Sequence, residues 1–148
     1  MNKRLTVFTK RLLDVMYYAM MVGIVTLPWL LKAYEGYDSN YHAVYLLVLP
    51  VFIVSGILSL LIIGQLRRMM ATVLADDCFQ PANVTSLRLM GTYSFLIAAV
   101  YAIRIFVYPT LSVAVIIIVF LVAGLFSKVL AQVFARAVAY KNENDLTI

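Results

Sequence analysis

The chain has 148 residues, of which 64% are hydrophobic and only 13% are charged. A soluble domain is about 25% charged, so this composition excludes an ordinary soluble core. The single cysteine, Cys78, excludes an internal disulfide and a thiolate metal cluster. The net charge of +5 is expected from basic residues beside a bilayer, so it does not by itself indicate binding of nucleic acid. We therefore expect one membrane domain over residues 1–148, with lipid as a partner, no cofactor and no direct binding of nucleic acid.

Two uncharged segments in the first half are long enough to cross a bilayer. The first runs for 17 residues, Val15 to Leu31, behind a basic leader, and Lys32 follows it instead of a small-residue cleavage site. The second covers 24 residues, Ala43 to Leu66. At about 1.5 Å per residue both approach the thickness of a hydrocarbon core of about 30 Å. These segments predict spans at 14–32 and 43–66, the first being retained as an anchor.

The third apolar region, Leu89 to Ser127, is too long for a single span. Pro109 lacks a backbone donor and disfavours a helix at the residue before it, so a turn is expected over 108–110. The turn predicts spans at 87–108 and 111–133. Since these runs lack the alternation of a barrel, the expected fold is all-α, an integral membrane four-helix bundle.

The distribution of cations predicts the orientation of these spans. With the N-terminus inside, only Lys32 lies in an outer loop, whereas ten cations lie at cytoplasmic ends. The ten are Lys3, Arg4, Lys10, Arg11, Arg67, Arg68, Arg88, Lys128, Arg136 and Lys141. Both termini are therefore expected in the cytoplasm of a bacterium, with the protein in the inner membrane. Tyrosines and Trp29 mark the outer face, which also carries Glu35 and Asp38.

Two segments expected in the cytoplasm contain polar, non-repetitive residues that insertion into a bilayer does not require. The first is a loop expected over 67–91, in which Asn83 is predicted to cap the next helix and Cys78, beside two aspartates, is expected to be an inert thiol. The second is a tail over 134–148 that begins as an amphipathic extension of the fourth helix. Small residues repeat at spacing four along that helix, which favours close packing within the bundle or, alternatively, a homodimer seam. This stripe contains Ala123, Ser127, Ala131, Ala135 and Ala139.

Three stretches resemble a family of bacterial proteins. They are Phe79-x-x-x-Asn83-Val84-x-x-Leu87-Arg88-x-Met90-Gly91, the pair Val133-Phe134, and the ending Glu143-Asn144-Asp145-Leu146-Thr147-Ile148. Together they resemble an uncharacterised family of small four-span membrane proteins, a domain of unknown function. The resemblance implies a partner, because members tend to be encoded beside a small Cro/CI-type helix-turn-helix regulator. It implies no catalytic residue.

Enzymatic and transport functions find little support in the residues. The one histidine, His42, has no second His or Cys at ligand spacing, and the carboxylates lie outside the spans or at their edges, so no enzyme is expected. Arg104 is the one intramembrane ionisable residue expected. Its side chain either reaches the outer headgroups or forms a polar site for an anionic ligand.

The sequence therefore predicts a membrane accessory or modulator of a helix-turn-helix transcription regulator. The alternative is a small-molecule or peptide-resistance protein, either a transporter or an immunity factor. The loop and tail are expected to form one partner-binding surface, with the acidic tail either docked on the basic loop or presented to a basic DNA-binding protein. Candidate contact residues are Phe79, Asn83, Arg88, Glu143, Asn144, Asp145 and Leu146.

Overall fold

The computed structural model describes residues 2–34 and 41–146, with side chains described for 2–33 and 46–146. Its helices are α1 (Lys3–Tyr34), α2 (Tyr41–Leu74), α3 (Pro81–Val107) and α4 (Leu111–Leu146). All four are long and apolar enough to cross a membrane, which confirms the predicted four-helix membrane fold. The predictions for Glu35, Asp38 and the final two residues lie outside the described residues, and so does the side chain of His42.

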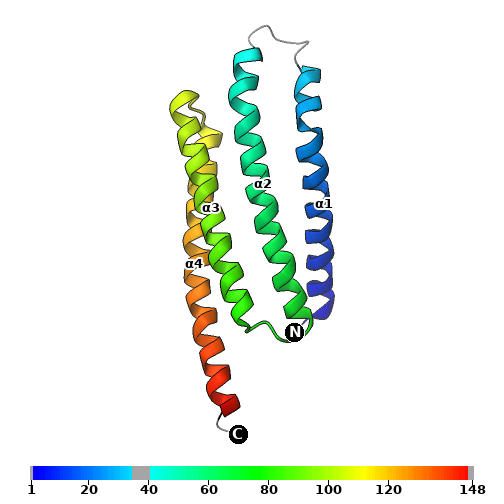
Figure 1. Ribbon diagram of the computed structural model, residues 1–148, viewed down its shortest axis with the longest axis vertical. Coiled ribbons are helices and arrows are strands. Elements are labelled where there is room, and N and C mark those ends of the chain that lie inside the picture. Colours follow the sequence, from blue (N-terminus) through cyan, green and yellow to red (C-terminus); the bar gives the residue numbers. More distant parts are fainter. Residues whose placement is uncertain (1, 35–40, 147–148) are drawn as a thin grey trace.

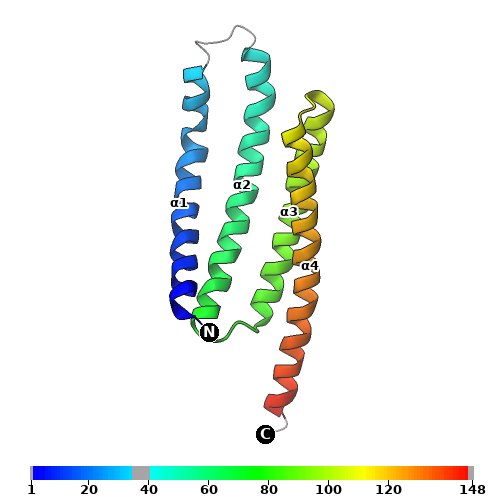
Figure 2. The ribbon, with the colours of Figure 1, turned by 180° about the vertical axis from the view of Figure 1, so that it is seen from behind.

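The four helices pack in chain order (Figures 1 and 2). Among the described residues, α1 contacts only α2, α2 lies between α1 and α3, and α4 packs against α3. The start of α1 and the end of α4 lie at the same end of the molecule, as an even number of crossings requires. At this end α4 projects beyond the other helices (Figure 1).

The predicted turn after the third span is confirmed. Helix α3 ends at Val107, and the Tyr108 backbone N–H donates to the Arg104 carbonyl at 2.9 Å. Helix α4 begins at Leu111, two residues after Pro109. The Thr110 hydroxyl accepts a hydrogen bond from the Val113 N–H at 3.3 Å and so satisfies one of the unpaired donors of the first turn.

The buried core lies where α2, α3 and α4 meet. Ile97 and Tyr101 of α3 pack with Val113 of α4, and apolar side chains of α2 cover this cluster. A second cluster nearer the termini joins Leu87 and Met90 of α3 to Ala131 of α4. The bundle is therefore held chiefly by α3 and its two neighbours.

Two glycines allow α3 and α4 to pack closely. A methyl group built on Gly124 would lie 2.7 Å from the Phe95 ring, and one on Gly91 would lie 3.1 Å from the Gly124 carbonyl oxygen. The stripe of small residues continues this contact: Ala131 is only 1% exposed, Ala135 is half-buried and Ala139 is exposed. The middle of the stripe therefore packs within a single chain, against α3, and is covered there.

Helices extend into the predicted cytoplasmic loop from both sides. Helix α2 continues through Arg67 and Arg68 to Leu74, and α3 begins at Pro81, so the non-helical part is 75–80. Basic residues mark where a chain leaves a bilayer, but they are good helix formers and do not end a helix. The chain turns away from α2 instead at Asp76, which has a positive φ of 55°.

The prediction that Asn83 caps α3 is wrong. Gln80 is the capping residue, with an extended backbone and no side-chain capping bond, and Pro81 occupies the first turn. Proline suits this position because its φ is fixed near the helical value and the N–H that it lacks would have no helical partner. Asn83 therefore falls inside the first turn, where its side chain is buried.

Candidate functional site

The loop at 75–80 contacts the end of α4. The Lys141 ammonium donates to the Asp77 carboxylate at 2.7 Å, and the Phe79 ring packs edge-on against Phe134 at a centroid distance of 5.3 Å. This loop and the tail beyond residue 133 thus lie side by side, as the sequence predicted. The ion pair has the opposite polarity to the predicted docking, because here the loop supplies the acid and α4 supplies the base.

The Asp77 carboxylate is held in its charged form. The Lys141 ammonium first, and then the Gln80 amide that donates to it at 2.8 Å, lower the pKa of Asp77 below its ordinary value. A carboxylate whose pKa is lower in the folded protein stabilises the fold at pH values above its ordinary pKa. That stabilisation is lost as the pH falls through the lowered pKa. The contact is therefore intact at neutral pH.

The buried side chain of Asn83 anchors the loop at 75–80. Its side-chain amide donates to the Thr72 hydroxyl at 2.7 Å and to the Cys78 carbonyl at 2.6 Å, and only 2% of the residue is exposed. These bonds tie the end of α2, the loop and the start of α3 together. Asn83 thus positions the predicted surface and is not itself exposed on it.

The other predicted contact residues lie on the outside. Phe79 is 42% exposed, Arg88 faces outward, and its carbonyl accepts a hydrogen bond from the Lys128 ammonium at 3.0 Å. The predicted tail is helical up to Leu146, which is 86% exposed. Glu143, Asn144 and Asp145 are exposed in the same last turns. We call residues 134–146 the α4 arm.

Arg104 lies at the opposite end of the molecule, in the last turn of α3. The residue is half-buried, with its guanidinium 5.8 Å from the Phe52 ring centroid and 5.9 Å from that of Tyr101. It borders a hollow of about 400 Å³ between α2 and α3, which is otherwise mainly apolar. The described lining thus combines the Arg104 cation with apolar side chains and fits both of the roles expected for Arg104.

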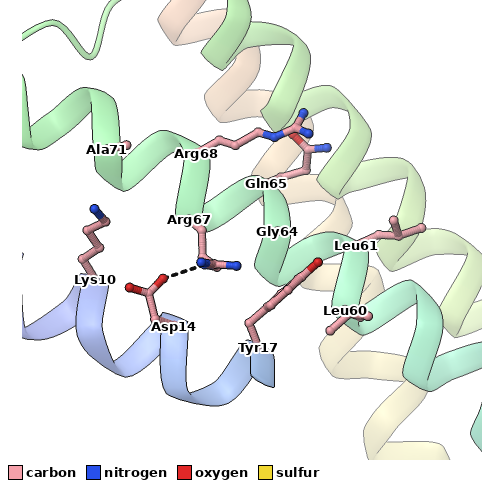
Figure 3. Close-up of a pocket in the computed structure, with 10 residues that line it drawn as sticks. All are labelled: Lys10, Asp14, Tyr17, Leu60, Leu61, Gly64, Gln65, Arg67, Arg68 and Ala71. Carbon is pink, nitrogen blue, oxygen red and sulfur yellow. Dashed lines mark hydrogen bonds and ion pairs between the residues drawn. The ribbon is translucent and has the colours of Figure 1, made fainter. Parts of the chain in front are cut away.

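A polar cluster between α1 and α2 was missed at the sequence level. The Arg67 guanidinium donates to the Asp14 carboxylate at 2.6 Å and lies 4.5 Å from the Tyr17 ring centroid (Figure 3). The signal was present, because Asp14 directly precedes the first uncharged run and Arg67 directly follows the second. Antiparallel neighbouring spans place these two positions at the same depth in a bilayer.

Comparisons with known proteins give the family without an activity. Neither the curated proteins nor the solved structures contain a match to the chain. A family model described as "Protein of unknown function (DUF2975)" matches residues 14–148. This match covers α1 from residue 14 onward, the other three helices, the loop at 75–80 and the α4 arm. The chain therefore belongs to this family of proteins of unknown function.

Proposed function

We propose that the protein is a membrane accessory or modulator of a cytoplasmic helix-turn-helix regulator. In this proposal it lies in a bacterial inner membrane with both termini inside. The ten-to-one distribution of cations supports the orientation. The gene neighbourhood implied by the family resemblance supports the class of partner. The loop at 75–80 and the α4 arm form the surface that the regulator contacts.

The observation that carries the proposal is the length of α4. Its 36 residues correspond to about 54 Å, against about 30 Å for a hydrocarbon core. About 20 residues suffice to cross, so a helix that enters the bilayer near Leu111 leaves it near Ala131. The α4 arm then stands in the aqueous phase, braced by Lys141 on Asp77 and by Phe134 on Phe79.

The chemistry of the α4 arm suits a basic protein partner. Tyr140 is 70% exposed and Leu146 is 86% exposed, so apolar surface remains outside the bilayer. Asp145 precedes Leu146 in the same exposed turn, four residues after Lys141. Exposed aromatic side chains are typical of contact surfaces. The Asp145 carboxylate complements the positive charge that a DNA-binding regulator offers. Such binding would compete with DNA for that charge.

The test uses the helix-turn-helix regulator that the family resemblance implies in a neighbouring gene, and two tyrosines of similar exposure. Tyr140 lies in the α4 arm, and Tyr108, which is 65% exposed, lies at the opposite end. We expect Tyr140→Ala to weaken binding of the regulator to membranes by about tenfold, as for a contact aromatic worth about 1.4 kcal/mol. Asp145→Lys should weaken it as well, and both should change target-promoter output. Tyr108→Ala should change neither.

Equal binding by all three variants and the unaltered protein would contradict the proposal. The resistance function then becomes the better candidate, and the hollow beside Arg104 is the observation in its favour. Among the lining residues that the structure describes, Arg104 is the one cation and most of the others are apolar, which matches an amphiphilic anion arriving from the outer side. Neighbouring transporter or bacteriocin genes would support that alternative.

A further inference from the structure

A second hollow lies between α1 and α2, near the end that holds both termini. Its volume is about 480 Å³, and Figure 3 shows the side chains around it. Three cations line it, Lys10 on α1 with Arg67 and Arg68 on α2, together with the single carboxylate of Asp14. The ion pair between Arg67 and Asp14 removes one charge of each sign. Two positive charges are left for a ligand.

The Arg67 guanidinium is held by several contacts in this hollow. Asp14 accepts its hydrogen bond at 2.6 Å, and the rings of Tyr17 and Tyr18 lie 4.5 and 5.4 Å from it. Contacts of this kind fix the planar group in one orientation at little further entropic cost. The hollow therefore has an ordered wall, unlike a loose group of surface lysines.

The lining changes from charged to apolar along the helix axis. Arg67 and Arg68 lie at the edge of the apolar run of α2, whereas Leu60, Leu61 and Gly64 lie one to two turns deeper. Seven residues of helix separate Leu60 from Arg67, a distance of about 10 Å along the membrane normal. A ligand that fits has a negative head at the membrane surface and a hydrocarbon chain pointing inward.

We propose that this hollow binds the phosphate head of an anionic phospholipid from the adjacent leaflet. In Figure 3 the charged groups of Lys10 and Arg68 lie on either side of Arg67, so both long side chains turn toward the phosphate when it binds, and the first part of one acyl chain lies along Leu60 and Leu61. Basic pockets between membrane helices are a common form of lipid-headgroup site. The proposal is independent of regulator binding, because the hollow lies on α1 and α2 and the α4 arm contributes no residue to it.

The test measures lipid binding to the full-length protein in detergent by native mass spectrometry. The probes are dioleoyl phosphatidylglycerol, dioleoyl phosphatidylcholine and inorganic phosphate. Phosphatidylglycerol should bind the unaltered protein, and phosphatidylcholine should bind much more weakly. We expect the double variant Lys10→Gln with Arg68→Gln to raise the dissociation constant for phosphatidylglycerol by about tenfold or more, and each single variant by about fivefold.

A matched double variant controls for general loss of charge. Lys3→Gln with Arg4→Gln removes the same two residue types from an exposed turn of α1 and should change the dissociation constant by less than about twofold. Equal effects of the two double variants would overturn the proposal in favour of unspecific attraction. Displacement of phosphatidylglycerol by millimolar inorganic phosphate would overturn the lipid assignment and identify a site for free phosphate. Circular dichroism checks the fold, and the single variants serve if a double variant does not fold.

Discussion

Replacing Ala131 with leucine is expected to lower the free energy of unfolding by about 1–3 kcal/mol, the usual cost of overpacking a core. The residue is 1% exposed and packs against Leu87 and Met90 of α3. The larger side chain has no space there, and α4 would have to move away from α3. Thermal unfolding of the purified protein in detergent measures the effect.

The matched control is the same substitution two turns further along the stripe. Ala139 is exposed, so Ala139→Leu should change stability by no more than about 0.5 kcal/mol. Ala135, which is half-buried, should give an intermediate loss. If leucine at positions 131 and 139 had equal effects, the stripe would not be a packing surface within the chain.

The second large effect is expected at Asn83. Asn83→Ala removes two buried hydrogen bonds, to the Thr72 hydroxyl and the Cys78 carbonyl, and leaves that carbonyl without its side-chain donor. Such a loss costs about 1–3 kcal/mol. Thermal unfolding should show it clearly, whereas Thr85→Ala, which alters an exposed hydroxyl two residues further on, should have little effect.

Asn83→Ala also distinguishes the two roles considered for Asn83, which are direct contact with the partner and positioning of the loop. If Asn83 only positions the loop, Asn83→Ala should lower the stability of the protein, and regulator binding should weaken only because the loop becomes disordered. If Asn83→Ala left the melting temperature unchanged and still abolished regulator binding, Asn83 would contact the partner directly and the structural role would be wrong.

Much of the fold can be predicted from the composition and from a few residues that interrupt helices. Long uncharged runs predict the number of helices, and Pro109 predicts the turn between α3 and α4. The ends of the helices were less predictable. The basic residues after Leu66 mark where the chain leaves the bilayer, but the helix continues through them to Leu74. The burial of Asn83 was missed for a related reason, since Pro81 starts α3 earlier than a polar cap would.

The contacts between helices were harder to predict than the helices themselves. Spans that are apolar all round give no periodicity to show which face meets a neighbour. The ion pair between Asp14 and Arg67 depends on the rotation of α1 against α2, although the depth of both residues could be read from the sequence. The close approach at Gly91 and Gly124 likewise depends on how α3 and α4 are turned toward each other.

Binding of a cytoplasmic regulator requires the loop at 75–80 to lie on the cytoplasmic side of the membrane, and Cys78 allows this to be measured directly. It is the single cysteine of the chain, lies in this loop and is partly exposed. A charged, membrane-impermeant maleimide should label Cys78 in inside-out vesicles and leave it unlabelled in intact spheroplasts. A Cys78→Ser variant carrying Ser39→Cys, between the first two spans, should show the reverse pattern. Labelling of Cys78 in intact spheroplasts would place the loop and the α4 arm outside the cell and contradict binding of a cytoplasmic regulator.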